Sequence, residues 1–123
     1  MNVVTLTGNL CKDIKLEYTK NNKEVLENVI AVNKDLKNPN GEYETDYISF
    51  VCFEKKAIYL NQYAHKGDKI ELVGKLRVDN WKDDSGEYHS RTYIVADKIK
   101  LLTSKPKSKE EISLEITEED LPF

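Results

Sequence analysis

Residues 43–53 constrain the fold more than any other stretch, because their side chains separate into two sets with the period of a β-strand. One set, Ile48, Phe50 and Cys52, needs a hydrophobic core. The other set would be polar if it simply faced water, yet it holds three aromatic rings among smaller residues: Tyr43, Tyr47 and Phe53. Rings on a half-exposed sheet are suited to stacking with unpaired nucleobases. Burial of both faces, in a sandwich core or at a subunit interface, explains the same pattern, since aromatic residues favour strands.

The rest of the chain predicts one helix, at residues 54–64, and four further strands, at residues 3–7, 25–33, 69–79 and 90–102. Gly8 indicates a bulge or bend, after which residues 10–18 resume extended character. Five strands with one short helix between the third and the fourth fit the order of an all-β OB-fold barrel. An SH3-like barrel or a small sandwich shares the strand count, but the place of the helix favours the OB fold.

Two local patterns make more detailed predictions. One face of the helix holds Ala57, Leu60, Asn61 and Ala64, and Gly67 is placed to end the helix in the left-handed conformation. Residues 69–79 alternate cleanly, and the positions predicted to face inward are Ile70, Leu72, Gly74 and Leu76.

The length of 123 residues is enough for one domain with a single core. No apolar run approaches the roughly 20 residues of a membrane helix, and the N-terminus carries no secretory signal, so we expect a cytoplasmic protein. The two cysteines, Cys11 and Cys52, form no CxxC pair, which argues against a zinc site or a redox motif. We expect both thiols to be reduced.

The net charge of −3 comes from the C-terminal residues. Six of the 22 acidic residues and three of the 19 basic residues follow Thr103, so the preceding part carries equal numbers of each. Phosphates would therefore have to meet local positive charge rather than a global field. We divide the chain into a domain, residues 1–103, and an acidic tail, residues 104–123, which begins with a charged segment typical of disorder.

In an OB fold, the face of the second and third strands and the loops beside it bind oligonucleotides or oligosaccharides. Trp81 lies in a polar hairpin without apolar neighbours, which favours stacking on a ligand over a core position. Basic residues beside the aromatic ones would neutralise phosphates. The predicted DNA-binding residues are Lys34, Leu36, Lys37, Tyr47, Phe53, Lys55, Arg77, Trp81 and Lys82, with Lys56 and Arg91 nearby. The tyrosines predicted to pack in the core or in an interface are Tyr18, Tyr59, Tyr63, Tyr88 and Tyr93.

The sequence offers little for catalysis or metal binding. His65 and His89 have no Cys or His partner at metal-ligand spacing, and Asp83 and Asp84 fit a hairpin turn. No Walker, GxSxG or HExxH motif occurs. We therefore predict a protein that is not an enzyme and that uses no metal or cofactor. A nuclease on an OB scaffold, and an OB module that docks proteins or RNA, are the alternatives.

The chain ends in acidic residues followed by two apolar side chains and a free carboxylate: Asp120, Leu121, Pro122 and Phe123. Solubility alone does not require a terminal phenylalanine. A peptide of this kind suits capture by a hydrophobic pocket ringed with basic residues. These four residues are therefore predicted to bind a protein partner.

Several motifs follow one another in a fixed order: residues 1–10 with Gly8-Asn9-Leu10, then Lys12-Asp13, Lys66-Gly67-Asp68, residues 73–77, Trp81-Lys82-Asp83 and the terminal Asp120-Leu121-Pro122-Phe123. In this order, and over essentially its whole length, the chain resembles bacterial-type single-stranded DNA-binding proteins. Each motif alone is of moderate specificity, but the set with the tip at the terminus is strong.

The resemblance implies an OB-fold homotetramer, associated with the nucleoid, that coats single-stranded DNA without sequence preference. It also implies that the tip recruits replication, recombination and repair proteins. Members of the family usually carry four stacking aromatic residues; Tyr47, Phe53 and Trp81 match three of them, whereas Leu36 occupies the fourth position and predicts a weaker platform there. The short spacer before the tip is typical of a phage- or mobile-element-encoded member.

Overall fold

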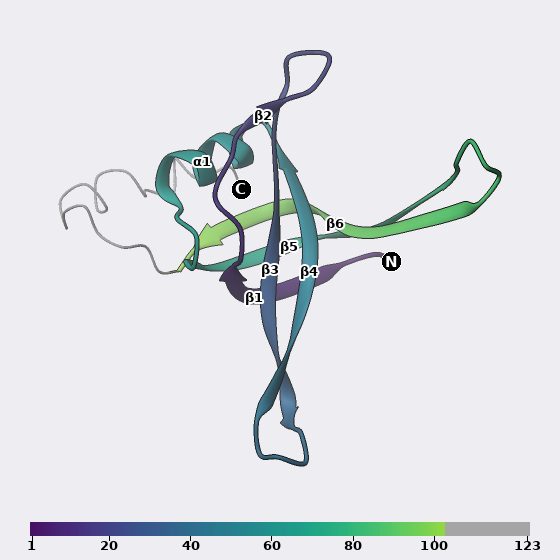
Figure 1. Cartoon of the computed structure of the whole chain (residues 1–123). Coiled ribbons are helices and arrows are strands. Elements are labelled where there is room, and N and C mark those ends of the chain that lie inside the picture. Colours follow the sequence, from purple (N-terminus) through teal and green to yellow (C-terminus); the bar gives the residue numbers. More distant parts are fainter. Residues whose placement is uncertain (103–123) are drawn as a thin grey trace.

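The computed structural model of the chain describes residues 1–102. Its elements are β1 (Val4–Leu10), β2 (Glu17–Tyr18), β3 (Glu24–Lys37), β4 (Tyr43–Phe53), α1 (Lys55–Tyr63), β5 (Lys69–Lys82) and β6 (Tyr88–Leu101). The sheet order is β1-β5-β6-β4-β3-β2, and an additional pairing of β1 with β3 closes it. All pairings are antiparallel except that of β4 with β6. The predicted all-β architecture is confirmed: five long strands form a closed barrel, and the helix lies between the third and fourth of them (Figure 1).

The core fills the barrel with the side chains that alternation assigns to the inside. Phe50 and Cys52 are fully buried and Ile48 packs against them, as predicted for one face of β4. Helix α1 contributes Ala57 and Leu60 to the same cluster. Of the residues predicted to share one helical face, Asn61 is exposed, and Tyr59 is buried in addition to Ala57 and Leu60.

Tyr59 and the residues after α1 join the helix to the barrel. The Tyr59 hydroxyl accepts a hydrogen bond from the backbone N–H of Leu101 at 3.1 Å, so its predicted packing role is confirmed. Gly67 has a positive φ of 93°, but the helix already ends at Tyr63, and the cap is the Ala64 N–H bonded to the Leu60 carbonyl. Gly67 therefore shapes the turn that precedes β5 rather than the helix terminus. Within residues 1–102, no helix has the length and hydropathy to cross a bilayer.

The barrel closes where β1 changes partners. The strand predicted to stop at residue 7 continues to Leu10: it pairs with β5 as far as Asn9, and Asn9 and Leu10 also pair with Ala31 and Ile30 of β3. Gly8 lies at this crossing, where a Cβ atom would overlap the carbonyl oxygen of Ala31. Gly8 therefore permits close approach of two backbones; the prediction of a strand break there is wrong, and beyond Leu10 residues 11–16 form no strand.

Two arms leave the barrel as two-stranded ribbons, β3–β4 and β5–β6, in different directions (Figure 1). Strands β3 and β5 extend past residues 33 and 79, where the predicted strands ended, to Lys37 and Lys82. Leu76 keeps the inward parity of β5 but is exposed, because its part of the strand has left the barrel. The prediction that Leu76 lies in the core is wrong for this reason.

Both arms end in the same turn. Asn38 and Asp83 each accept hydrogen bonds through one side-chain oxygen from the backbone N–H groups two and four residues later. Gly41 and Gly86 take positive φ angles of 81° and 88° at matching positions. The sequences responsible are Lys37-Asn-Pro-Asn-Gly-Glu-Tyr43 and Lys82-Asp-Asp-Ser-Gly-Glu-Tyr88, which set a lysine directly opposite a tyrosine at each tip.

The close approach at Gly8 makes a prediction about stability. Gly8→Ala should lower the free energy of unfolding by about 1–3 kcal/mol, because the added methyl group has to displace the β3 backbone. Urea unfolding followed by circular dichroism measures this change. Gly41→Asn is the control, since a Cβ atom at Gly41 would meet no other atom within 4 Å and asparagine tolerates positive φ. Equal stability of Gly8→Ala and the parent protein would contradict the assigned crossing.

The two thiols should differ in reactivity. Burial raises the pKa of Cys52 to about 12, so this side chain stays a protonated thiol at any ordinary pH, whereas the thiolate is the reactive form. Cys11 is partly exposed. We expect one thiol per folded chain to react with a thiol reagent at pH 8, and two after denaturation. Rapid labelling of folded Cys11→Ser protein would show that Cys52 is accessible.

Candidate nucleic-acid interface

The outer face of β4 presents aromatic rings to solvent. Tyr47 is 71% exposed and Phe53 is half-buried, while Phe50 and Cys52 point into the core from the opposite face. The residues directly opposite on β3, Ala31 for Tyr47 and Val25 for Phe53, have compact side chains. The exposure of Tyr47 excludes burial of both faces of this strand within one chain.

The β5–β6 arm has two faces of different character. Cross-strand partners share a face, and successive residues alternate. One face carries the pairs Arg77–Tyr93, Asp79–Arg91 and Trp81–His89, and the other carries Val78–Thr92, Asn80–Ser90 and Lys82–Tyr88. Tyr88 is 80% exposed, so it does not pack in the core of this chain.

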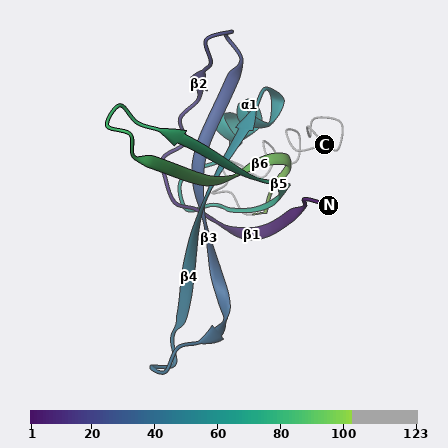
Figure 2. The same cartoon turned by 90° about the vertical axis from the view of Figure 1, so that its right-hand side faces the viewer.

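An ion pair joins the arm to the outer face of β3 and β4. The guanidinium of Arg91 lies 3.5 Å from a carboxylate oxygen of Glu27, which is directly opposite Val51 of β4. Val51 has the outer parity yet is only 6% exposed. In Figure 2 the β5–β6 arm points toward the viewer and crosses β3 and β4. The face that carries Trp81 is therefore continuous with the face that carries Tyr47 and Phe53.

Contacts of Tyr93 with Asp79 and Arg91 stabilise the part of the β5–β6 arm that lies between Trp81 and the barrel. The Tyr93 hydroxyl donates a hydrogen bond to Asp79 at 2.8 Å, and this bond raises the pKa of Tyr93. The Arg91 guanidinium lies 5.2 Å from the centroid of the Tyr93 ring. Tyr93 thus holds the arm in shape, with its ring half-buried.

Trp81 has a neighbour that the sequence pattern did not reveal. Its indole stacks on the imidazole of His89 with ring centroids 5.6 Å apart and an interplanar angle of 23°. Trp81 is 48% exposed, so part of the indole is open to a ligand. The polar hairpin was predicted to offer Trp81 no apolar neighbours, and strand register sets the imidazole of His89 directly opposite it.

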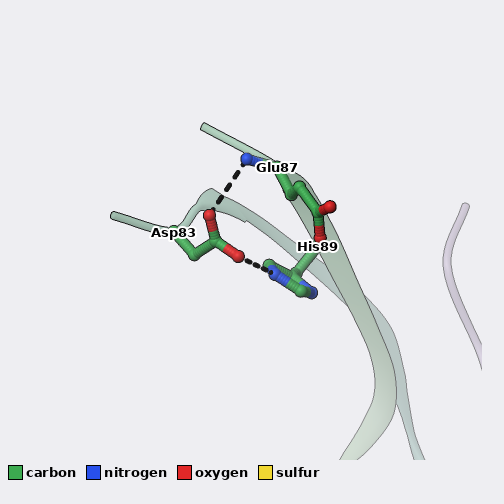
Figure 3. A group of neighbouring side chains, drawn as sticks. All are labelled: Asp83, Glu87 and His89. Carbon is green, nitrogen blue, oxygen red and sulfur yellow. Dashed lines mark hydrogen bonds and ion pairs between the residues drawn. The ribbon is translucent and has the colours of Figure 1, made fainter. Parts of the chain in front are cut away.

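Asp83 anchors both the turn and the histidine (Figure 3). One carboxylate oxygen accepts hydrogen bonds from the Ser85 hydroxyl and the backbone N–H groups of Ser85 and Glu87, and the other lies 2.6 Å from Nε2 of His89. Hydrogen bonds with Ser85 and His89 lower the pKa of Asp83 to about 2, so its carboxylate is ionised and the imidazole Nε2–H donates to it. The predicted turn role of Asp83 is confirmed.

Asp83, Glu87 and His89 also bring their potential metal-ligating atoms within 4.8 Å of one another. Both carboxylate oxygens of Asp83 are already used by the turn and by His89. Within residues 1–102 the hydrogen bonds of Asp83 with the turn and with His89, which stacks on Trp81, account for this arrangement without a metal.

The predicted basic residues do not all lie on one face. Lys34 is 3.2 Å from Glu44 and 3.6 Å from Asp46, on the β3–β4 face opposite Tyr47. The hydrogen bond with Glu44 and the charge of Asp46 raise the pKa of Lys34. Leu36 is 82% exposed and lies between Asn33 and Lys37, where the register of β3 against β4 shifts.

The structure therefore brings together Tyr47, Phe53, Arg77 and Trp81, with Lys37 farther along the outer face at the arm tip and Lys55 at the start of α1, two residues after Phe53. Lys34 and Lys82 point to the other faces of their ribbons, and Leu36 lies in the register shift between Asn33 and Lys37. Sequence reasoning did not include His89 in the site and named Arg91 only as a nearby basic residue. The repeated turn sequence could have shown the strand register that puts both residues on the face of Trp81. The predicted partner-binding residues Asp120, Leu121, Pro122 and Phe123 lie outside the described residues.

His89 should control the environment of Trp81, which is the one tryptophan of the sequence. Removing the stacked ring in His89→Ala should increase quenching of Trp81 fluorescence by acrylamide and shift its emission to the red. His65→Ala is the control, because His65 contacts Asp68 at the end of the helix instead. Identical quenching in both variants would contradict the stacked arrangement.

The comparisons with known proteins agree with this geometry. The family model of the single-strand binding protein family matches residues 1–102. A single-stranded DNA-binding protein of Streptococcus mutans is 34% identical over 105 residues, which are 85% of this chain and 64% of the relative. Single-stranded DNA-binding protein 1 of Streptococcus pyogenes is 32% identical over 129 aligned residues, with 100% of this chain and 99% of the relative covered. A relative from Enterococcus faecalis is 34% identical over 110 residues, which are 89% of this chain and 58% of the relative.

The chain thus spans less than two thirds of some relatives and nearly the full length of another. The relatives carry the names of binding proteins rather than enzymes, in agreement with the predicted absence of catalysis. The resemblance inferred from the sequence motifs is confirmed by the family match and by the barrel. On these grounds the chain belongs to the single-strand binding protein family.

Proposed function

We propose that this protein binds single-stranded DNA without sequence specificity, by stacking bases on aromatic rings and by contacting phosphates. The observation that carries the proposal is the continuous face formed by Tyr47 and Phe53 of β4 and Trp81 of the β5–β6 arm. Every base has a π-face, so stacking tolerates any sequence. The names of the bacterial relatives support the same ligand.

The charge distribution fits this mode of binding. Each stacked base is worth about 1–3 kcal/mol, so three rings supply substantial affinity without hydrogen bonds to base edges. Arg77 lies on the arm face of Trp81, and Lys55 begins α1 just after Phe53. Phosphate contacts from such residues make affinity fall as salt rises, with a slope of about −0.7 per phosphate for single strands.

The assembly and partners of the protein complete the proposal. Residues 1–103 form the DNA-binding domain, four copies assemble into a homotetramer, and residues 104–123 carry the terminal Asp120, Leu121, Pro122 and Phe123. These four residues recruit replication, recombination and repair proteins, since acids followed by apolar groups and a terminal carboxylate suit a hydrophobic pocket with a basic rim. Such a protein works in the cytoplasm, at the nucleoid. The support is the resemblance of the motifs and the chemistry of the tip.

A titration with oligo(dT), followed by Trp81 fluorescence at low and at high salt, tests the DNA-binding part of the proposal. We expect quenching that saturates at a fixed stoichiometry and weakens with salt. Tyr47→Ala and Phe53→Ala should each raise Kd roughly 5- to 150-fold, which corresponds to the loss of one stacked base. Tyr18→Ala is the control, since Tyr18 is an exposed tyrosine on β2.

Two outcomes would redirect the proposal. A flat titration at low salt, together with no retention of labelled oligo(dT) on a filter, would contradict DNA binding and favour a protein-docking module. Tighter binding of oligo(U) than of oligo(dT) would assign the same face to RNA.

A further inference from the structure

We propose that Tyr43, at the tip of the β3–β4 arm, is an additional base-stacking residue, and that Lys37 contacts the phosphate beside it. The inference rests on the proposed function and extends the path of the strand beyond Tyr47. Tyr43 takes the place on this path that the resemblance assigned to Leu36.

Tyr43 and Tyr47 share the outer face of β4. They are four residues apart on one strand, which separates their Cα atoms by about 13 Å. Between them lies the cross-strand pair of Thr45 and Asn33, whose side chains hydrogen-bond to each other at 3.1 Å. Small polar side chains bonded to one another leave the surface between the two rings low and open.

The Tyr43 ring is available and is held in place. It is 56% exposed, and the Lys37 ammonium lies 5.5 Å from its centroid. A cation over one face of a ring limits its motion and leaves the opposite face for a base. Phe53, Tyr47 and Tyr43 then form a row whose ends are ten residues, or about 33 Å, apart along β4.

Lys37 is also the lysine of this arm that is free to meet a phosphate. Among residues 1–102 the structure gives it no carboxylate partner, whereas Lys34 on the opposite face is paired with Glu44 and Asp46. Leu36 lies between Asn33 and Lys37, where the register of β3 against β4 shifts, and it is not paired with a β4 residue, whereas Lys37 is paired with Tyr43. A ring and an unpaired cation therefore coincide at Tyr43 and Lys37, and they do not coincide at Leu36.

The other arm provides a matched comparison. Tyr88 follows the same turn sequence, faces Lys82 in the same way at 5.0 Å and is also solvent-exposed, but it lies on the arm face opposite Trp81. The same local structure is thus present once on the proposed DNA path and once away from it. Any effect of Tyr43 that depends on the path should be absent at Tyr88.

The experiment measures anisotropy of labelled oligo(dT) over a series of lengths spanning the ~4–16 nucleotides that one OB fold covers. Tyr43→Ala should bind the shortest oligonucleotides like the parent protein and lose about 5- to 10-fold in affinity for the longer ones. Tyr43→Phe, which keeps the ring, should bind like the parent at all lengths. Tyr88→Ala should also bind like the parent.

Lys37→Met gives a second, independent measurement, because it keeps the aliphatic stem and removes the charge. The slope of log affinity against log salt for long oligo(dT) should become shallower by about 0.7, while Tyr43→Ala should leave the slope unchanged. This readout does not depend on the shape of the arm tip in Tyr43→Ala.

The outcomes separate this inference from the function on which it rests. Failure of the parent protein to bind oligo(dT) would overturn the proposed function. If Tyr47→Ala weakens binding but Tyr43→Ala binds normally at every length, only the role of Tyr43 is overturned. An equal loss in Tyr43→Ala and Tyr88→Ala would also overturn it, since the effect would not follow the face.

Discussion

The backbone crossing at Gly8 is the constraint on which the rest of the structure depends. A five-stranded sheet has no unpaired edges only if it closes into a barrel. Closure requires β1 to pair with β3 while it is still paired with β5. Here β1 passes from β5 to β3 within two residues, and the missing side chain of Gly8 leaves room for the β3 carbonyl. With the wall closed and the core filled, β3, β4, β5 and β6 are free to continue outward as ribbons.

Once the ribbons leave the barrel, alternation decides what each residue can do. A barrel strand has an inside and an outside, but a free ribbon has two faces that both meet water. Side chains that are neighbours in sequence then have different surroundings: Trp81 stacks on His89, while Lys82 beside it faces Tyr88 on the other side of the ribbon. The candidate interface is therefore defined by strand register as much as by residue type, and the ion pair between Arg91 and Glu27 joins its two halves.

The sequence predicted the structure correctly where a strand keeps the same surroundings along its whole length, so that alternation alone separates buried from exposed side chains. The limits of β4 and the inward set of Phe50 and Cys52 were predicted correctly, and so was the place of the helix. It failed where tertiary structure changes the environment without changing the pattern. Leu76 continues the inward parity of β5 after the barrel has ended, and Gly8 has a role only in relation to Ala31. The stacking of Trp81 on His89 depends on a register that the turn at Asp83 sets.

The carboxylates of Glu44 and Asp46 give one face of the β3–β4 ribbon an excess of negative charge. On their face the single positive charge of Lys34 is outnumbered by two negative charges, whereas Lys37, which lies over the Tyr43 ring, forms no ion pair among the described residues. A polyanion that approaches this arm is therefore repelled from the face of Glu44 and Asp46 over distances of about a Debye length, roughly 8–10 Å. The ribbon thus disfavours one of its two sides for an anion before any ring is touched, although residues 1–103 carry equal numbers of acidic and basic residues.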